Sequence, residues 1–136
     1  MSEKLNFSLV SPARELFSGE VDHVIAPGSE GEFGVLPNHA PFMSTLRSGR
    51  VRIIEGDEVH RYFVHGGFAD VTPEGLTILA EEAIRLEDLN EEGILNAISE
   101  AEMARDGAAD QATRFKAEGD VQRLKAQLDA LSEAHH

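Results

Sequence analysis

Up to Arg85, apolar and polar residues alternate with the period of two that is typical of half-buried strands. Leu5, Phe7 and Leu9 alternate with polar neighbours, and further apolar runs rich in β-branched residues follow at 21–26, 51–54, 59–64 and 76–80. Turn-forming residues separate these runs, at Ser11-Pro12, Ser18-Gly19, Pro27-Gly28, Ser48-Gly49, Gly56-Asp57, Gly66-Gly67 and 73–75. Many short strands at this spacing predict an antiparallel β-sandwich or a barrel.

After Arg85 the apolar period becomes helical. Two narrow apolar stripes follow, one at Ile94, Ile98 and Ala101 and one at Val121, Leu124, Leu128 and Leu131. Between them, Asp106-Gly107 predicts a helix stop and Asp110 an N-cap. The pattern predicts two domains, a β-sandwich at 1–86 and an antiparallel α-helical hairpin at 87–136.

The predicted hairpin is marginal by itself, because each helix offers one narrow stripe and Gly119 weakens the second helix by roughly 1 kcal/mol relative to alanine. Two interpretations follow. The hairpin either lies statically against the sandwich or is an element that moves.

Composition excludes several classes of function. The 136 residues contain 25 acidic and 12 basic side chains, for a formal net charge of −13, which repels phosphate backbones and anionic lipid headgroups. Absence of cysteine excludes disulfides and thiolate metal sites. The amino terminus lacks the apolar core of a secretory signal, and no stretch approaches ~18 apolar residues. We therefore expect no nucleic-acid partner, no direct membrane insertion, and membrane association only through a partner.

The histidines do not predict a metal site. His60 and His65 differ by an odd number of positions in one expected strand, so they face opposite sides of the sheet. His23 and His39 stand alone, and the pair 135–136 closes the chain, where it is either frayed or an expression scar. Because no pair has the i, i+4 spacing of a helical zinc site, no metal is expected.

A dense group of glycines and prolines lies between Gly31 and Gly49. The overlapping stretch 28–34 is glycine-rich but carries two glutamates and lacks the lysine of a P-loop, so it predicts a tight hairpin or a bulge with exposed acids. Two functional interpretations remain for the whole group. It is either a rigid interaction surface, or part of a small ligand-binding sandwich or enzyme that uses His39 and the neighbouring acids.

Two long motifs bear on this choice. GSEGEFGVLPNHAPFMSTLRSGRVRI at 28–53, followed by VHGGFADVTPEGLTILAEEAIR at 64–85, resembles the amino-terminal sandwich of the epsilon-subunit family of bacterial F-type ATP synthases, the counterpart of mitochondrial delta subunits. The resemblance implies about ten strands followed by two helices. It also implies a non-catalytic central-rotor subunit without cofactor, which links gamma to the c-ring at the cytoplasmic face of the bacterial inner membrane so that proton flow drives ATP synthesis.

The resemblance also assigns contacts. The c-ring contacts it implies are Ser29, Glu30, Gly31 and Glu32. The gamma contacts it implies are Ser11, His39, Ala40, Pro41, Phe42 and Met43. Exposed acids on a turn suit a polar, partly basic loop of a c subunit.

The hairpin departs from the family in one respect. Many bacterial relatives begin their first helix with an aspartate and, three residues later, an arginine followed by alanine, a pattern associated with ATP binding. Here these positions hold Asn90, Gly93 and Ile94, so the arginine fork that pairs with phosphate is missing and weak or no ATP binding is expected.

In relatives the hairpin also extends along gamma, reaches the alpha and beta subunits, and blocks ATP hydrolysis. The resemblance makes four basic residues candidates for contacts to beta: Arg114, Lys116, Arg123 and Lys125. The alternative interpretation is a solvated helix face with alternating charges.

Overall fold

The computed structural model of the chain describes residues 3–134. The chain divides into two units, one through Arg85 and one from Leu86 onward, and each is described by itself. Within residues 3–134, neither helix contains an apolar stretch that meets the requirements of a transmembrane span.

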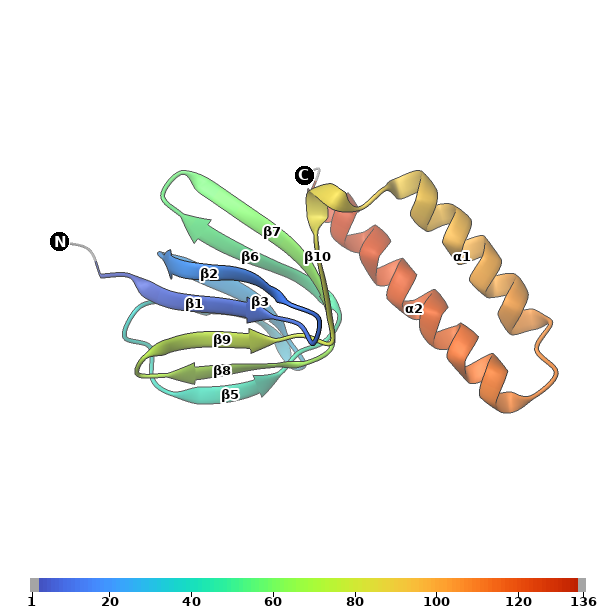
Figure 1. Cartoon of the computed structure of the whole chain (residues 1–136), viewed down its shortest axis with the longest axis horizontal. Coiled ribbons are helices and arrows are strands. Elements are labelled where there is room, and N and C mark those ends of the chain that lie inside the picture. The colour runs from blue at the N-terminus through green and yellow to red at the C-terminus, as the bar shows by residue number, and fades with distance from the viewer. Residues whose placement is uncertain (1–2, 135–136) are drawn as a thin grey trace. The chain divides into compact units, whose positions relative to one another are not determined.

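The first sheet of the N-terminal unit has five strands in the order β2-β1-β9-β8-β5 (Figure 1). Their bounds are β1 Leu5–Val10, β2 Glu15–Val21, β5 Phe42–Thr45, β8 Phe68–Thr72 and β9 Gly75–Leu79. The strand β1 pairs antiparallel with β2 and parallel with β9, whereas the other pairs are antiparallel. Strands β2 and β5 therefore form the edges.

The second sheet has the order β10-β7-β6-β3-β4, and all its pairs are antiparallel. Its strands are β3 His23–Gly28, β4 Gly31–Val35, β6 Gly49–Glu55, β7 Glu58–His65 and β10 Glu82–Arg85. Ten strands in two sheets confirm the predicted β-sandwich.

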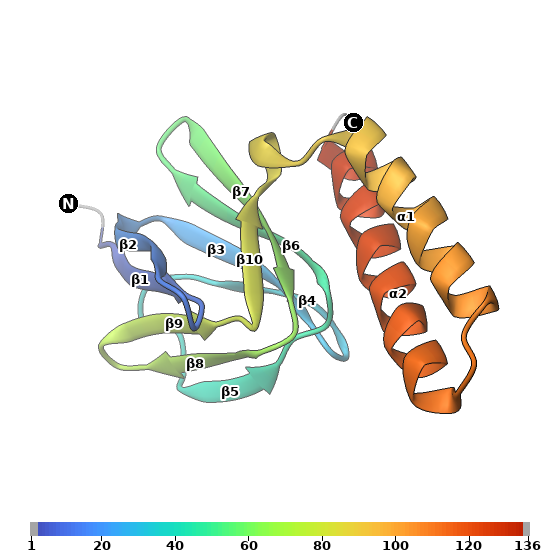
Figure 2. The same cartoon turned by 45° about the vertical axis from the view of Figure 1, so that its right-hand side comes forward.

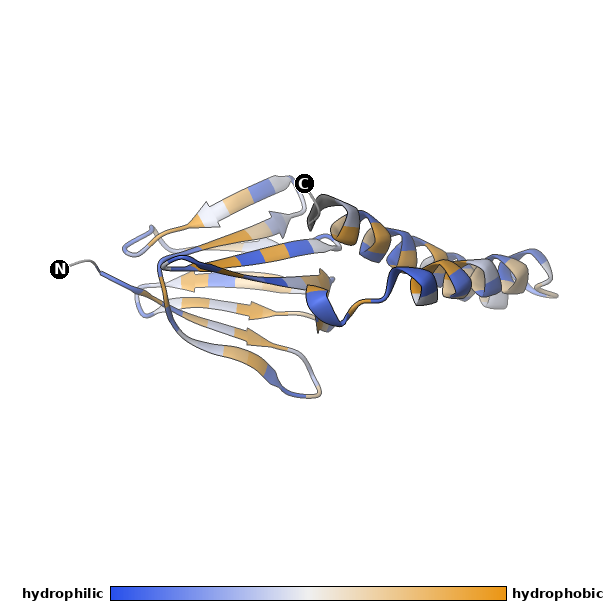
Figure 3. Cartoon of the chain, turned by 90° about the horizontal axis from the view of Figure 1, so that it is seen from above, coloured by the Kyte–Doolittle hydropathy of each residue, from blue (hydrophilic) through white to orange (hydrophobic). Residues whose placement is uncertain are grey.

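The core lies between the two sheets, where apolar side chains project from alternate positions. Figure 3 shows the accompanying alternation of hydrophobic and hydrophilic residues along the strands. Leu9, Ile53 and Ile78 are completely enclosed there. Because each strand presents one face inward, the period of two in the sequence follows directly from burial on one side.

Two predicted boundaries of strands are wrong. Ser18-Gly19 lies inside β2, where Gly19 pairs with Phe7, because an edge strand accepts a glycine without a turn. The apolar run at 21–26 breaks at Asp22, which separates β2 from β3. The carboxylate of Asp22 accepts a hydrogen bond from the backbone N–H of Gly56 at 2.7 Å, so this residue serves the neighbouring β6–β7 turn.

The C-terminal unit contains a short 3₁₀ turn, η1 (Leu86–Asp88), and the helices α1 (Glu91–Asp106) and α2 (Gln111–Ala134). The helices lie side by side and run antiparallel (Figure 2), which confirms the predicted hairpin. Helix α1 ends at Asp106 and is capped by Gly107, as the sequence predicts. The predicted N-cap is also confirmed, because the Asp110 carboxylate accepts a hydrogen bond from Thr113 N–H at 2.7 Å.

The two stripes of the hairpin meet in a small core. Ile94 and Ile98 of α1 pack with Leu124 of α2, and Ala101, Leu128 and Leu131 border this cluster. This core contains few side chains, as expected from the narrow stripes.

Candidate interaction surface

A two-residue turn joins β3 and β4. Gly28 pairs with Gly31, and Ser29 and Glu30 lie between them at the tip. Gly31 has a φ of 138°, which a residue with a side chain rarely adopts. All four predicted c-ring residues, Ser29, Glu30, Gly31 and Glu32, are exposed. The predicted tight hairpin with exposed acids is thus confirmed, and residues 28–32 are called the acidic tip below.

The acidic tip is attached to the edge strand of the other sheet. The backbone N–H of Ser29 donates to the carbonyl of Thr45 at 3.0 Å, and the Thr45 hydroxyl donates to Ser29 Oγ at 2.9 Å. Gly28 also forms an antiparallel bridge with Leu46. These contacts close one corner of the sandwich and hold the tip on a rigid support.

A shallow hollow of about 480 Å³ lies between the acidic tip and β5. Phe42 and Met43 line it, and the Phe42 ring meets the Phe33 ring edge-on at a centroid distance of 5.4 Å. Met43 is an exposed large hydrophobic residue, with 66% of its surface accessible. The structure therefore brings the predicted c-ring contacts next to Phe42 and Met43 of the predicted gamma contacts.

The remaining residues of that stretch, His39, Ala40 and Pro41, are exposed in the loop before β5. The His39 ring meets the Phe42 ring at 5.3 Å, and its backbone N–H donates to the carbonyl of Leu36 at 3.2 Å. Residues 39–43 thus form one continuous strip, called the β5 strip below.

Ser11 is separated from His39 and Phe42. It follows Val10, and the register across the sheet runs from Val10 through Leu79 and Phe68 to Thr45, at the far end of β5 from Phe42. Three strand spacings, roughly 14 Å, also separate β1 from β5. The six predicted gamma contacts therefore do not form one patch.

Glu32 has a partner that the sequence did not indicate. An Nη atom of Arg52 on β6 lies 2.8 Å from a carboxylate oxygen of Glu32, across β3, and the Glu32 side chain remains 48% exposed. The period of two places Arg52 on the outer face of β6, but the pairing depends on the strand order. The charge of Glu32 is therefore partly balanced within the sandwich.

The predicted basic contacts on α2 differ in environment. Arg114, Lys116 and Lys125 are exposed, whereas Arg123 is half-buried and lies 3.8 Å from the Asp120 carboxylate. The one basic residue of α1 was not predicted to have a role. Arg105 donates to Glu118 of α2 at 2.9 Å and so connects the two helices.

Glu118 also accepts a hydrogen bond from Gln122 at 2.9 Å. This bond first, and the Arg105 guanidinium second, hold the pKa of the Glu118 carboxyl below its usual value. The charged form of Glu118 is therefore the one that best joins α2 to Arg105 of α1.

The three positions of the degenerate nucleotide motif build the start of α1. The Asn90 side chain caps the helix by accepting a hydrogen bond from Gly93 N–H at 2.8 Å, and Ile94 is buried in the hairpin core. This cap was not predicted, although asparagine before a helical pattern is a known N-cap signal.

The expected separation of two histidines is confirmed. His60 and Tyr62 share one face of β7, whereas His65 lies on the other face, with Nδ1 2.6 Å from the Ser48 hydroxyl. His60 lies beside Glu55 and Glu58, a grouping that the spacing of the histidines alone does not indicate. The residues 135–136 lie outside the described part of the chain.

Comparison with known proteins identifies the family. Residues 4–86 match the model of the β-sandwich domain of the ATP synthase delta/epsilon chain. A relative from Hyphomonas neptunium, called ATP synthase epsilon chain, is 73% identical over 95 residues, which are 69% of this chain and 70% of the relative. A relative of the same name from Caulobacter vibrioides is 67% identical over 81 residues, which are 60% of this chain but 94% of the relative.

A solved structure shows the same fold over almost the whole chain. The matching chain belongs to the Euglena gracilis mitochondrial ATP synthase, described as OSCP/F1/c-ring in rotational state 1, with a TM-score of 0.79 and 26% identity over 98% of this chain and 82% of that chain. Sequence and structure agree with the resemblance carried by residues 28–53 and 64–85. The chain belongs to the ATP synthase delta/epsilon family, as an epsilon chain.

Proposed function

We propose that this chain is a non-catalytic subunit of the central rotor, which joins gamma to the c-ring so that rotation driven by proton flow reaches the catalytic head. The single observation that carries the proposal is the acidic tip, which is exposed, rigidly supported and continuous with the β5 strip. Attachment to the rotor gives the chain a peripheral position on the cytoplasmic face of the bacterial inner membrane.

The two parts of this surface suit two different partners. Glu30 and Glu32 are exposed acids at a turn, which complement a polar loop containing basic residues, as a c subunit would present. Met43 offers an exposed apolar side chain of the kind found at the centre of protein interfaces, which suits gamma. A subunit that transmits torque needs a stiff connection between its two interfaces, and the hydrogen bonds between Ser29 and Thr45 supply one.

The alternative, an enzyme or ligand-binding sandwich that uses His39, requires polar groups that converge in an enclosed pocket. His39 is exposed, and its ring contact is with Phe42. Among the residues whose burial is described, the buried polar side chain outside the apolar core is Gln127, which is 4% exposed and lies in α2. The geometry therefore favours an interaction protein.

Charge reversal at the acidic tip tests the proposal. Glu30→Lys with Glu32→Lys is expected to leave binding to purified gamma intact and to weaken association of the gamma complex with isolated c-ring. Glu20→Lys is the matched control, because Glu20 is an exposed acid on β2, the edge strand opposite β5 in the same sheet. Equal c-ring association for both variants, or turnover by the isolated chain, would contradict the proposal.

We further propose that the hairpin contacts alpha and beta when it extends, and restrains ATP hydrolysis. Arg114, Lys116 and Lys125 support this role, since their exposed charges are available to acidic loops. The Caulobacter relative is only slightly longer than its 81 matched residues, which is close to the size of the sandwich alone, so an epsilon chain of that size exists. If complexes with and without residues 87–136 hydrolyse ATP at the same rate, the hairpin has no inhibitory role.

A further inference from the structure

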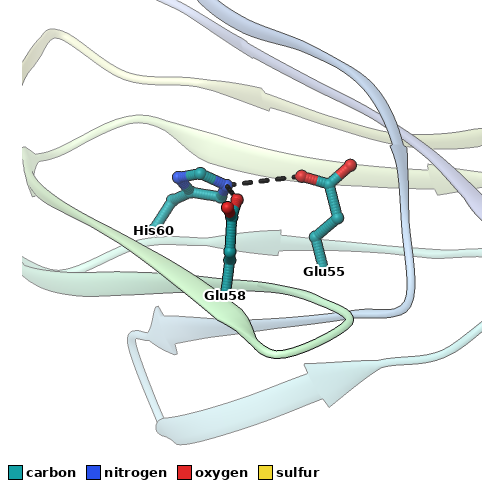
Figure 4. A group of neighbouring side chains, drawn as sticks. All are labelled: Glu55, Glu58 and His60. Carbon is teal, nitrogen blue, oxygen red and sulfur yellow. Dashed lines mark hydrogen bonds and ion pairs between the residues drawn. The ribbon is translucent and has the colours of Figure 1, made fainter.

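Three potential metal ligands converge at the β6–β7 turn. His60 Nε2 lies 3.4 Å from a carboxylate oxygen of Glu55 and 3.5 Å from one of Glu58, and the three ligand atoms all lie within 4.8 Å of one another (Figure 4). The register explains the convergence. Glu55 pairs with Glu58, and His60 follows Glu58 by two residues, so all three side chains leave the same face of the hairpin.

The backbone that carries these ligands is held in place. The N–H of Gly56, in the turn itself, donates to the carboxylate of Asp22 at 2.7 Å, and Asp22 also forms an ion pair with Lys4. The pKa of the Asp22 carboxyl is lowered first by the hydrogen bond from Lys4 and next by that from Gly56. The turn is therefore fixed by a charged neighbour that is not one of the ligands.

The imidazole is also positioned by packing. The His60 ring meets the Phe17 ring of β2 at a centroid distance of 5.4 Å, and the His60 side chain is 30% exposed. This contact joins the two sheets and limits rotation of the ring. Glu55 and Glu58 are more exposed, at 46% and 72%, so the face opposite the ring is open to water and to an entering ion.

We propose that Glu55, Glu58 and His60 bind a divalent transition-metal ion of the zinc class, with water completing the coordination shell. In a tetrahedral zinc site, metal–ligand bonds of about 2.0–2.2 Å place neighbouring ligand atoms about 3.3–3.6 Å apart. The observed separations of 3.4 and 3.5 Å match that spacing before any rearrangement. One imidazole with two carboxylates also favours zinc over magnesium or calcium, which prefer oxygen ligands alone.

The site has a structural consequence. A metal held by both ends of the β6–β7 turn and by His60 stabilises the folded sandwich, because the unfolded chain does not hold these ligands together.

The test is a zinc titration of the full chain, followed through the imidazole signals of His60 in histidine side-chain NMR spectra, so that other histidines do not contribute. We expect zinc to shift the His60 signals. Glu58→Gln is expected to weaken this site at least about tenfold, since even outer-shell changes at metal sites cost 10–100-fold. Glu74→Gln, at the β8–β9 turn of the other sheet, is the matched control and is expected to bind like the unchanged protein.

Three outcomes would overturn the proposal. His60 signals that do not respond to zinc exclude a metal site at this turn. Equal zinc affinity of the Glu58→Gln variant and the unchanged protein shows that the two carboxylates and the imidazole do not act together. Equal responses to magnesium and to zinc indicate a carboxylate site without an imidazole ligand. Glu58 is largely exposed, so its substitution leaves the fold intact and a negative result is interpretable.

Discussion

The hydroxyl of Thr45 donates a hydrogen bond to the hydroxyl of Ser29 at 2.9 Å, and thereby joins the edge strand of one sheet to the acidic tip of the other. A second bond, from Ser29 N–H to the Thr45 carbonyl, uses the backbone alone. The side-chain bond and the backbone bond can therefore be separated by mutation.

Thr45→Val removes the hydroxyl while it preserves the shape of the side chain. A typical hydrogen bond contributes about 1 kcal/mol, so opening of the acidic tip is expected to become about fivefold more frequent. Amide hydrogen exchange at residues 29–31 measures this opening. Thr77→Val, in the central strand β9, is the control and should leave exchange at the tip unchanged.

His39→Ala is expected to weaken binding to gamma, because His39 contacts Phe42 within the β5 strip. The fold should not change, since His39 is exposed. The structure adds a sharper expectation for Ser11→Ala. The two residues lie at opposite ends of different strands, so their effects on binding free energy should add within about 0.5 kcal/mol. Calorimetry of the single and double variants with purified gamma measures this, and strong coupling would show that both touch the same part of gamma.

Asn90→Ala removes the N-cap of α1. Loss of the hydrogen bond to Gly93 N–H should destabilise the hairpin by about 1 kcal/mol. Hydrogen exchange of the amides at the start of α1 reports this change. Asn96→Ala, an exposed substitution in the middle of the same helix, is the control; an equally large effect there would mean that capping is not the cause.

ATP is expected to bind the isolated chain weakly or not at all. The positions that would supply an aspartate and an arginine hold Asn90 and Gly93, and the Asn90 side chain is already engaged as a cap. Glu91 and Glu92 in the first turn add repulsion toward phosphate. Calorimetric titration that gives micromolar affinity for ATP would refute this expectation.

Acid is expected to loosen the hairpin through Glu118. The folded pKa of this carboxyl is lowered from a reference value of 4.5, so its contribution to stability is present above that value and is lost as the pH falls through the lower, folded pKa. Asp110 acts in the same direction, since hydrogen bonds from Thr113 lower its pKa. Glu118→Gln should therefore reduce the acid-dependent loss of helical circular dichroism, whereas Glu100→Gln, on exposed α1 surface, should not.

The sequence predicts what depends on local pattern. The strands β1, β3, β6, β7 and β9, the hairpin, the helix stop at Gly107 and the cap at Asp110 follow from periodicity and from the residues at element ends, whereas the other five strands lie almost entirely outside the apolar runs of the sequence. The exposure of the acidic tip follows from two glutamates between glycines. These features require no knowledge of which strands are neighbours.

The relationships that were missed depend on strand order. Arg52 reaches Glu32 across β3, and His60 reaches Glu55 because the β6–β7 register aligns them. The separation of Ser11 from His39 likewise depends on the parallel pairing of β1 with β9. A resemblance that assigns residues one by one cannot show which of them share a surface.

The parallel pair of β1 and β9 also bears on how the chain is made. Phe7 pairs with Leu76, so the strand synthesised first waits for the ninth strand to leave the ribosome before its sheet is complete. Until then β1 pairs with β2 alone, and the edge of β1 that later pairs with β9 has no partner. All ten strands precede the two helices in the chain, so every strand of the sandwich leaves the ribosome before the helices do.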